Sequence, residues 1–186
     1  MSEQKKYEFT GEIKTILGIE FKQIRAIVSF GCVVAGEIGG WIESEENLSQ
    51  YGNAWVSGNA RVSGNARVSG NAEVSGDAWV YGNAEVSGNA EVSGNARVYG
   101  NAEVSGNAEV KKDDDYMIIG GAGRYNRFTT FFKCRDKTIK VICGCFFGTI
   151  IEFRAKVKET HKGNKHEKVY LAMANMVELQ LDDDDK

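Results

Sequence analysis

The fold is decided by residues 51–110, which read YGNAWV SGNARV SGNARV SGNAEV SGDAWV YGNAEV SGNAEV SGNARV YGNAEV SGNAEV. These ten hexapeptides follow one another without insertion or deletion. In an extended chain the alanine and valine of each unit face one side, and the variable residue between them faces the other. The Gly-Asn pair before them tolerates positive φ and allows a sharp turn. The fixed alternation of short strands and sharp turns predicts a coiled chain in which each unit is stable only when it packs on the units next to it.

This pattern resembles the left-handed β-helix of hexapeptide-repeat proteins. In that family an aliphatic residue opens each unit, a small residue lies four positions on, and three units complete one triangular coil. Val56 and Ala60, and every later pair, match the pattern. The resemblance implies that residues 18 apart stack about 4.8 Å from each other along the axis. We therefore expect a mainly β chain built on a left-handed parallel β-helix.

The segment before the repeats is expected to cap the coil. Residues 1–32 alternate apolar and polar side chains around Gly18, which predicts a β-hairpin cap. Residues 33–50 are interpreted as a degenerate first coil, so that the solenoid spans 33–110. Counting back 18 residues from the regular repeats places three bulky residues at core positions: Ile38, Ile42 and Leu48.

Residues 111–181 predict a small α+β domain at the other end. Three alternating stretches, 116–119, 129–132 and 138–143, are expected to be strands. Two helical patterns follow, with apolar or packing residues at Ile150, Phe153, Val157, His161, Val169, Met173, Met176 and Val177. The last five residues, 182–186, read DDDDK, the recognition sequence of a protease used to remove tags. They are interpreted as a tag remnant or as a natural disordered acidic tail.

Composition indicates a soluble globular protein, with 42% hydrophobic and 26% charged residues, and the cytoplasm is the expected compartment. No apolar run reaches the roughly 20 residues needed to span a bilayer, and residues 1–6 do not resemble a signal peptide. The four cysteines are too few for a disulfide framework and are expected to be reduced. Net charge is uneven: residues 1–110 sum to -6, 111–181 to +6, and 182–186 to -3.

The number and position of histidines decide whether this chain can be an enzyme of the hexapeptide-repeat family. Acyltransferases of that fold use a solenoid histidine as general base, and the carbonic anhydrases need three histidines. The sequence has only His161 and His166, both far beyond the repeats. We expect no enzyme activity, no catalytic residue and no cofactor.

Two further motifs contain residue types that can bind a metal ion or a phosphate. Cys134, Cys143, Cys145 and His161 could form a Cys3His zinc site, but Cys-Gly-Cys is not the usual knuckle spacing, and ordinary thiols in an extended stretch are the favoured interpretation. The glycine-rich residues 120–124 could hold a phosphate only if they opened a helix. A strand follows them, so a turn between strands is predicted and no metal or phosphate site is expected.

The variable positions should form three outward columns on the solenoid. The second column places Trp79 between two arginines, in reach of cation-π contacts on both faces. These residues are interpreted either as a structural stack or as a recognition stripe. The columns are Trp55, Glu73, Glu91 and Glu109; then Arg61, Trp79 and Arg97; then Arg67, Glu85 and Glu103.

A second candidate surface is the basic stretch 124–140. Its cations could contact phosphate, and its aromatic residues could stack on bases. A solvated basic domain with its aromatics in the core is the alternative interpretation. The cations are Arg124, Arg127, Lys133, Arg135, Lys137 and Lys140, and the aromatics are Tyr125, Phe128, Phe131 and Phe132.

The whole chain is similar to small phage and prophage proteins, through YEFTGE, GEIGGWIESEENLS before GNAWV repeats, and the block TTFF, CGCFFGTIIEF and KETH. Some small phage proteins inhibit host defence, which implies a non-enzymatic inhibitor of a CRISPR nuclease (an anti-CRISPR) acting through protein or DNA binding. A phage assembly scaffold is the alternative, and an acyltransferase is disfavoured. We expect a macromolecular partner, with nucleic acid as a second possibility, no membrane, and a homodimer formed through an end domain.

Overall fold

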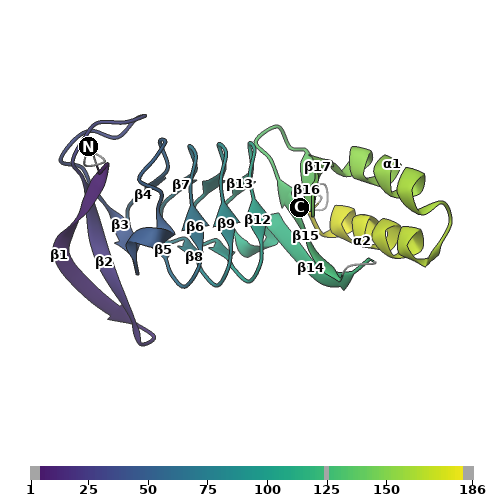
Figure 1. Cartoon of the computed structure of the whole chain (residues 1–186), viewed down its shortest axis with the longest axis horizontal. Coiled ribbons are helices and arrows are strands. Elements are labelled where there is room, and N and C mark those ends of the chain that lie inside the picture. The colour runs from purple at the N-terminus through teal and green to yellow at the C-terminus, as the bar shows by residue number, and fades with distance from the viewer. Residues whose placement is uncertain (1–4, 124–125, 182–186) are drawn as a thin grey trace.

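The computed structural model describes residues 5–123 and 126–181, and it is built around a parallel β-solenoid (Figure 1). Strands 18 residues apart pair in parallel, so that Trp55 lies beside Glu73 and Arg67 beside Glu85. Three sheets result, ordered β4-β7-β10-β13, β6-β9-β12, and β5-β8-β11 within a larger sheet. This confirms the predicted β-helix. The strands are β4 (Trp55–Val56), β5 (Arg61–Val62), β6 (Arg67–Val68), β7 (Glu73–Val74), β8 (Trp79–Val80), β9 (Glu85–Val86), β10 (Glu91–Val92), β11 (Arg97–Val98), β12 (Glu103–Val104) and β13 (Glu109–Val110).

The core of the solenoid consists of the repeated alanines and valines, all of which are 0–1% exposed. The corners depend on glycine. Gly76 has φ +67°, and a Cβ there would lie 3.0 Å from the backbone nitrogen and oxygen of Gly94 in the next coil. The corners are further joined by asparagine ladders, such as Asn53 Nδ2 to Asn71 Oδ1 at 3.0 Å. Small residues inside and amides at the corners therefore allow the coils to stack closely.

The N-terminal segment forms the predicted hairpin, β1 (Tyr7–Ile16) and β2 (Ile19–Ala26), and β3 (Ile38–Ile42) joins it to the solenoid. The predicted register of the first coil was wrong by two residues. Ile42 pairs with Val62 and Leu48 with Val68, a spacing of 20 rather than 18. Two additional residues, Ser49 and Gln50, precede the first regular repeat, and Ile38 is consequently 51% exposed. The Gln50 side chain accepts a hydrogen bond from the Lys6 N–H at 2.8 Å, so the insertion binds the hairpin.

The two ends of the solenoid are capped by opposite polar groups. Each coil donates its N–H groups to carbonyls of the next coil, which leaves free carbonyls at the N-terminal end and free N–H groups at the C-terminal end. Donors cap the first end: Lys6 Nζ donates to the Ala54 carbonyl at 2.7 Å, and Asn47 Nδ2, from η1 (Glu45–Asn47), donates to two carbonyls of the next coil at 2.9 Å. An acceptor caps the second: Asp113 Oδ1, in η2 (Asp113–Asp115), accepts from the Arg97 N–H at 2.7 Å. Both sheet edges are thereby protected.

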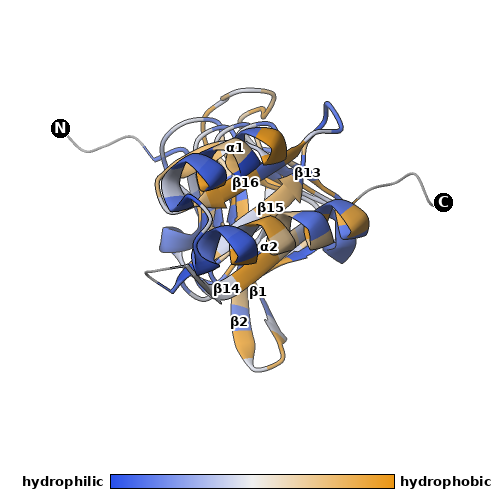
Figure 2. Cartoon of the chain, turned by 90° about the vertical axis from the view of Figure 1, so that its right-hand side faces the viewer, coloured by the Kyte–Doolittle hydropathy of each residue, from blue (hydrophilic) through white to orange (hydrophobic). Residues whose placement is uncertain are grey.

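The C-terminal region is an antiparallel sheet covered by two helices, as predicted. The sheet order is β14-β15-β16-β17, of which β17 was not predicted. Figure 2 shows the helices side by side across β15 and β16. Phe132 packs into the solenoid core, and its neighbour Phe131 packs under the helices. The elements are β14 (Tyr116–Ala122), β15 (Arg127–Lys133), β16 (Ile139–Cys143), β17 (Phe146–Thr149), α1 (Ile150–His161) and α2 (Lys165–Leu181).

Two local predictions in this region were wrong. Cys143-Gly144-Cys145 is a tight turn between β16 and β17, with Gly144 at φ +60°, and not an extended stretch. Met176 is 47% exposed, because the buried face of α2 is rotated toward Tyr170 and Ala174. None of the helices in the described ranges has the length and apolar character needed to cross a bilayer.

Candidate binding groove

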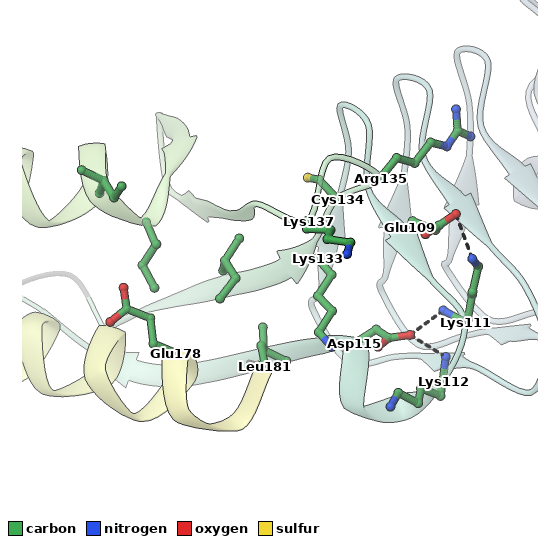
Figure 3. A pocket seen from close by; sticks show the side chains of 13 residues that line it. Glu109, Lys111, Lys112, Asp115, Lys133, Cys134, Arg135, Lys137, Glu178 and Leu181 are labelled. Atoms are coloured by element: carbon green, nitrogen blue, oxygen red, sulfur yellow. Dashed lines mark hydrogen bonds and ion pairs between the residues drawn. The ribbon is translucent and has the colours of Figure 1, made fainter. Parts of the chain in front are cut away.

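A groove lies where the last coil meets the C-terminal sheet and helices (Figure 3). Its volume is about 870 Å³. The floor is apolar, with the buried Ile150 and Leu181 and the half-buried Ile139, while the exposed Ile151 also lines the groove. The rim has five basic and three acidic side chains, a net charge of +2 in a chain of net charge -3. The charged residues are Glu109, Lys111, Lys112, Asp115, Lys133, Arg135, Lys137 and Glu178.

Ion pairs hold several of these cations in place. Arg135 Nη2 lies 3.1 Å from Glu91 Oε2 on the solenoid, and Lys133 Nζ lies 3.5 Å from Asp115 Oδ1. The Arg135–Glu91 pair is partly exposed, and such pairs contribute about 0–1 kcal/mol to stability, so a charged ligand can replace Glu91 at little cost. The side chains of Lys133 and Asp115 are only 16% and 9% exposed, so this second pair is buried and holds the floor of the groove together. Lys137 is exposed at the turn before β16, in the left-handed region at φ +62°. The groove thus presents two accessible cations, Arg135, whose partner Glu91 is partly exposed, and the exposed Lys137.

The basic residues predicted from the sequence do not form one surface. Lys133, Arg135 and Lys137 line the groove. Arg127 begins β15, six residues before Lys133 and hence about 20 Å away, where it lines a different cavity. Lys140 Nζ lies over the Phe147 ring, 5.3 Å from its centroid. The sixth predicted residue, Arg124, lies outside the described residues, as does Tyr125.

The aromatic residues of the same stretch were expected to stack on bases. Phe131 and Phe132 are fully buried on opposite faces of β15. Phe128 is exposed, but it packs against Gly120 and does not line the groove. The groove therefore combines a cationic rim with an aliphatic floor. No aromatic side chain among the described residues lines it for base stacking.

The columns on the solenoid have the predicted members, and Trp41 extends the second one. Arg61 lies over Trp79, with 5.0 Å between its Cζ and the ring centroid. The predicted sandwich was wrong on the other side, because in the described part of the chain Arg97 makes no such contact. The Tyr81 ring instead lies 4.7 Å from that of Trp79, and the buried Phe21 of the hairpin lies 6.4 Å away. The contacts of Trp79 are those of a structural stack that reaches the hairpin, and a recognition role for Arg61, Trp79 and Arg97 stays a prediction.

Three of the four cysteines and both histidines lie on the C-terminal sheet and helices, divided between the two faces of the sheet, whereas Cys32 lies in the loop after the N-terminal hairpin. Cys143, Cys145, His161 and His166 line a cavity of about 540 Å³ at the open end of the helices. Cys134 is buried against the solenoid, where burial raises the pKa of its thiol. Within residues 5–123 and 126–181, no group of three such side chains is close enough to hold a metal ion.

The stacked coils and their two caps define a β-solenoid repeat protein whose C-terminal end carries an antiparallel sheet and two helices. The YdcK beta solenoid repeat model matches residues 54–70, 60–76, 66–82 and 90–106, which is less than half of the chain. A relative from Escherichia coli (strain K12), named "Uncharacterized acetyltransferase YdcK", is 44% identical over 50 residues. That alignment covers 27% of this chain and 14% of the relative. The chain thus matches about a seventh of the relative's length, and the likeness concerns a repeat and not a whole protein.

Proposed function

We propose that this chain is a non-enzymatic binding protein whose groove holds an acidic segment of a partner protein. The observation that carries the proposal is the combination of a +2 rim with an aliphatic floor. An apolar floor accommodates aliphatic side chains, and the cations pair with carboxylates at the edge, which is the usual anatomy of a peptide groove. Nucleic acid is the weaker candidate because single strands are held largely by base stacking on aromatic side chains.

The likeness to phage proteins extends this proposal to a particular partner. We propose that the partner is a host defence nuclease, with a CRISPR nuclease as the leading candidate, and that the chain acts in the cytoplasm of the infected bacterium. Binding alone would suffice for such inhibition, because an acidic segment held away from its normal place can stop a nuclease without any chemistry.

The name of the relative raises acetyl transfer as another function. The similarity offers little support for it, since the matched region is a small fraction of that protein. This chain's histidines lie at the end of α1 and the start of α2, beyond the sheet that separates them from the solenoid. A solenoid acyltransferase needs a general base beside its coils, and this sequence places no histidine there.

A phage-plating assay tests the proposal. Expression of the chain in bacteria whose CRISPR nuclease restricts a phage should restore plating, and the nuclease should co-purify with the chain. The double variant Arg135→Ala, Lys137→Ala should lose both effects. The matched control Arg67→Ala, Lys158→Ala removes the same charge elsewhere and should keep them. Equal loss in the two double variants would contradict the groove, and binding of a short DNA duplex through Arg135 and Lys137 would assign it to nucleic acid.

A further inference from the structure

In the first column, Glu91 and Glu109 each pair with a cation, but within the described part of the chain Glu73 does not. Parallel pairing stacks Glu73, Glu91 and Glu109 about 4.8 Å apart, where like charges repel. Glu91 pairs with Arg135 at 3.1 Å, and Glu109 pairs with Lys111 at 3.0 Å. Among residues 5–123 and 126–181, Glu73 has no cation partner.

Glu73 also borders a cavity, which lies beside the loop that follows the hairpin. The cavity has a volume of about 160 Å³. The lining includes a second carboxylate, Glu37, whose Oε2 accepts a hydrogen bond from the Val34 N–H at 3.3 Å. Among the described residues, two carboxylates and no cation line this space, in contrast to the groove at the other end of the same column. The lining residues are Cys32, Val33, Glu37, Trp55, Ser57 and Glu73.

Trp55 is a further lining residue of the cavity. Trp55 is only 5% exposed, and its ring packs against Phe30 and Tyr7, with centroids 5.5 and 6.5 Å away. Its Nε1 is buried and has no hydrogen-bond partner within the described part of the chain. A buried donor without an acceptor is destabilising, and its resonance is sensitive to charge placed beside the ring.

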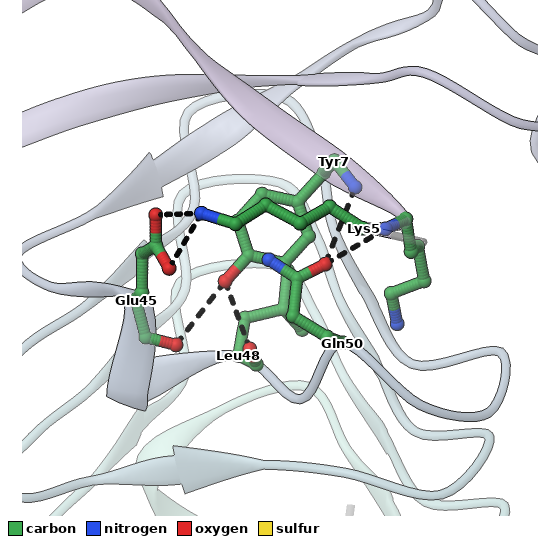
Figure 4. Close-up of polar contacts among 6 residues, drawn as sticks. Lys5, Tyr7, Glu45, Leu48 and Gln50 are labelled. Carbon is green, nitrogen blue, oxygen red and sulfur yellow. Dashed lines mark hydrogen bonds and ion pairs between the residues drawn. The ribbon is translucent and has the colours of Figure 1, made fainter. Parts of the chain in front are cut away.

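The segment that covers Trp55 is firmly attached to the first coil (Figure 4). The Tyr7 hydroxyl donates to the Leu48 carbonyl at 2.9 Å, and Lys5 pairs with Glu45 at 2.7 Å. The Trp55 indole is therefore fixed before any ligand arrives, which lowers the entropy cost of binding.

We propose that this cavity binds a basic side chain, lysine or arginine, of a partner protein. The cation would lie between the carboxylates of Glu37 and Glu73, with the aliphatic part of its side chain against the small exposed part of Trp55. A calcium ion is a poorer match, because it takes six to eight oxygen ligands. The site stands on its own observations and does not depend on the groove.

A small cation and its neutral isostere test the proposal in the full chain. N-acetyl-arginine N-methylamide supplies a guanidinium and two carbonyls, and the citrulline analogue keeps the carbonyls but is uncharged. We expect the arginine compound to shift the indole N–H resonance of Trp55 saturably, with the resonance identified by its loss in Trp55→Phe. The citrulline compound should bind at least tenfold more weakly.

Matched variants locate the effect. Glu73→Gln and Glu37→Gln should each weaken the arginine compound at least tenfold, whereas Glu85→Gln removes an exposed carboxylate from the neighbouring sheet and should not. Equal shifts by the arginine and citrulline compounds, or unchanged affinity in folded Glu73→Gln, would overturn the proposal. Tighter binding of calcium chloride at the same resonance would assign the cavity to a metal and overturn it as well. The groove variant Lys137→Ala should leave the titration unchanged, so this result is separable from the proposed function.

Discussion

Glycine at the solenoid corners allows a positive φ and also allows the backbone of the next coil to approach closely. Gly88 and Gly100 differ in the second of these requirements. Gly88 has φ +66° and Gly100 has φ +70°, so alanine at either enters the left-handed region at about 1–2 kcal/mol. At Gly88 the new Cβ would also lie 2.8 Å from the backbone nitrogen of Gly106, whereas at Gly100 nothing lies within 4 Å. Overpacking of a close contact costs about 1–3 kcal/mol more. Gly88→Ala should therefore cost more stability than Gly100→Ala by at least about 1 kcal/mol.

Urea and thermal unfolding of the two variants measure this difference. For a chain of this size 1 kcal/mol corresponds to about 2–4 °C in Tm, so Gly88→Ala should melt at least about 2 °C below Gly100→Ala. Equal m-values would show that the denatured states are comparable. If both variants lose the same stability, positive φ alone requires the glycines, and the close stacking of coils is not what limits these corners.

Three further predictions concern the core, the N-terminal cap and self-association. Ala78→Glu places a charge at a fully buried position and should lower the free energy of unfolding by about 3 kcal/mol or more. The exposed variant Glu85→Gln removes a charge that repels Glu103 and should be neutral or slightly stabilising. Similar decreases in Tm for the two variants would contradict the assignment of inward and outward positions. Burial lowers the pKa of Lys6 to about 8. Between pH 8 and about 10.5 the unfolded chain therefore holds a proton that the folded chain has released, and the free energy of unfolding should rise by about 1 kcal/mol per pH unit relative to the variant Lys6→Met. Parallel pH profiles of the two proteins would contradict this. We also expect a homodimer through the helical end, where Leu179 is 86% exposed, and sedimentation that shows only monomer well above micromolar concentration would refute it.

The solenoid was determined by the sequence almost completely. A strict six-residue period leaves few alternatives, because alanine and valine at fixed spacing can be buried only if each coil repeats the last. The members of the three columns follow directly from that period. The hairpin around Gly18 and the two C-terminal helices were also predictable, since their apolar periodicity is regular.

The register of the first coil could not be obtained from the period. Ser49 and Gln50 carry no pattern of their own, and only the hydrogen bond between Gln50 and Lys6 shows why two additional residues are accommodated there. A cap is specified by contacts between segments far apart in the sequence, and a local pattern does not contain them.

The candidate sites depended most on tertiary structure. In the sequence, Arg127 and Lys133 belong to one basic stretch, but an extended strand places them about 20 Å apart. Trp55 occupies an outward column position in the repeat, yet the loop after the hairpin covers it and forms a cavity with Glu37 and Glu73. Charge and burial at a site are set by which distant segments pack together, so the sequence determined the scaffold, and only the packing of its two ends decided where a partner can bind.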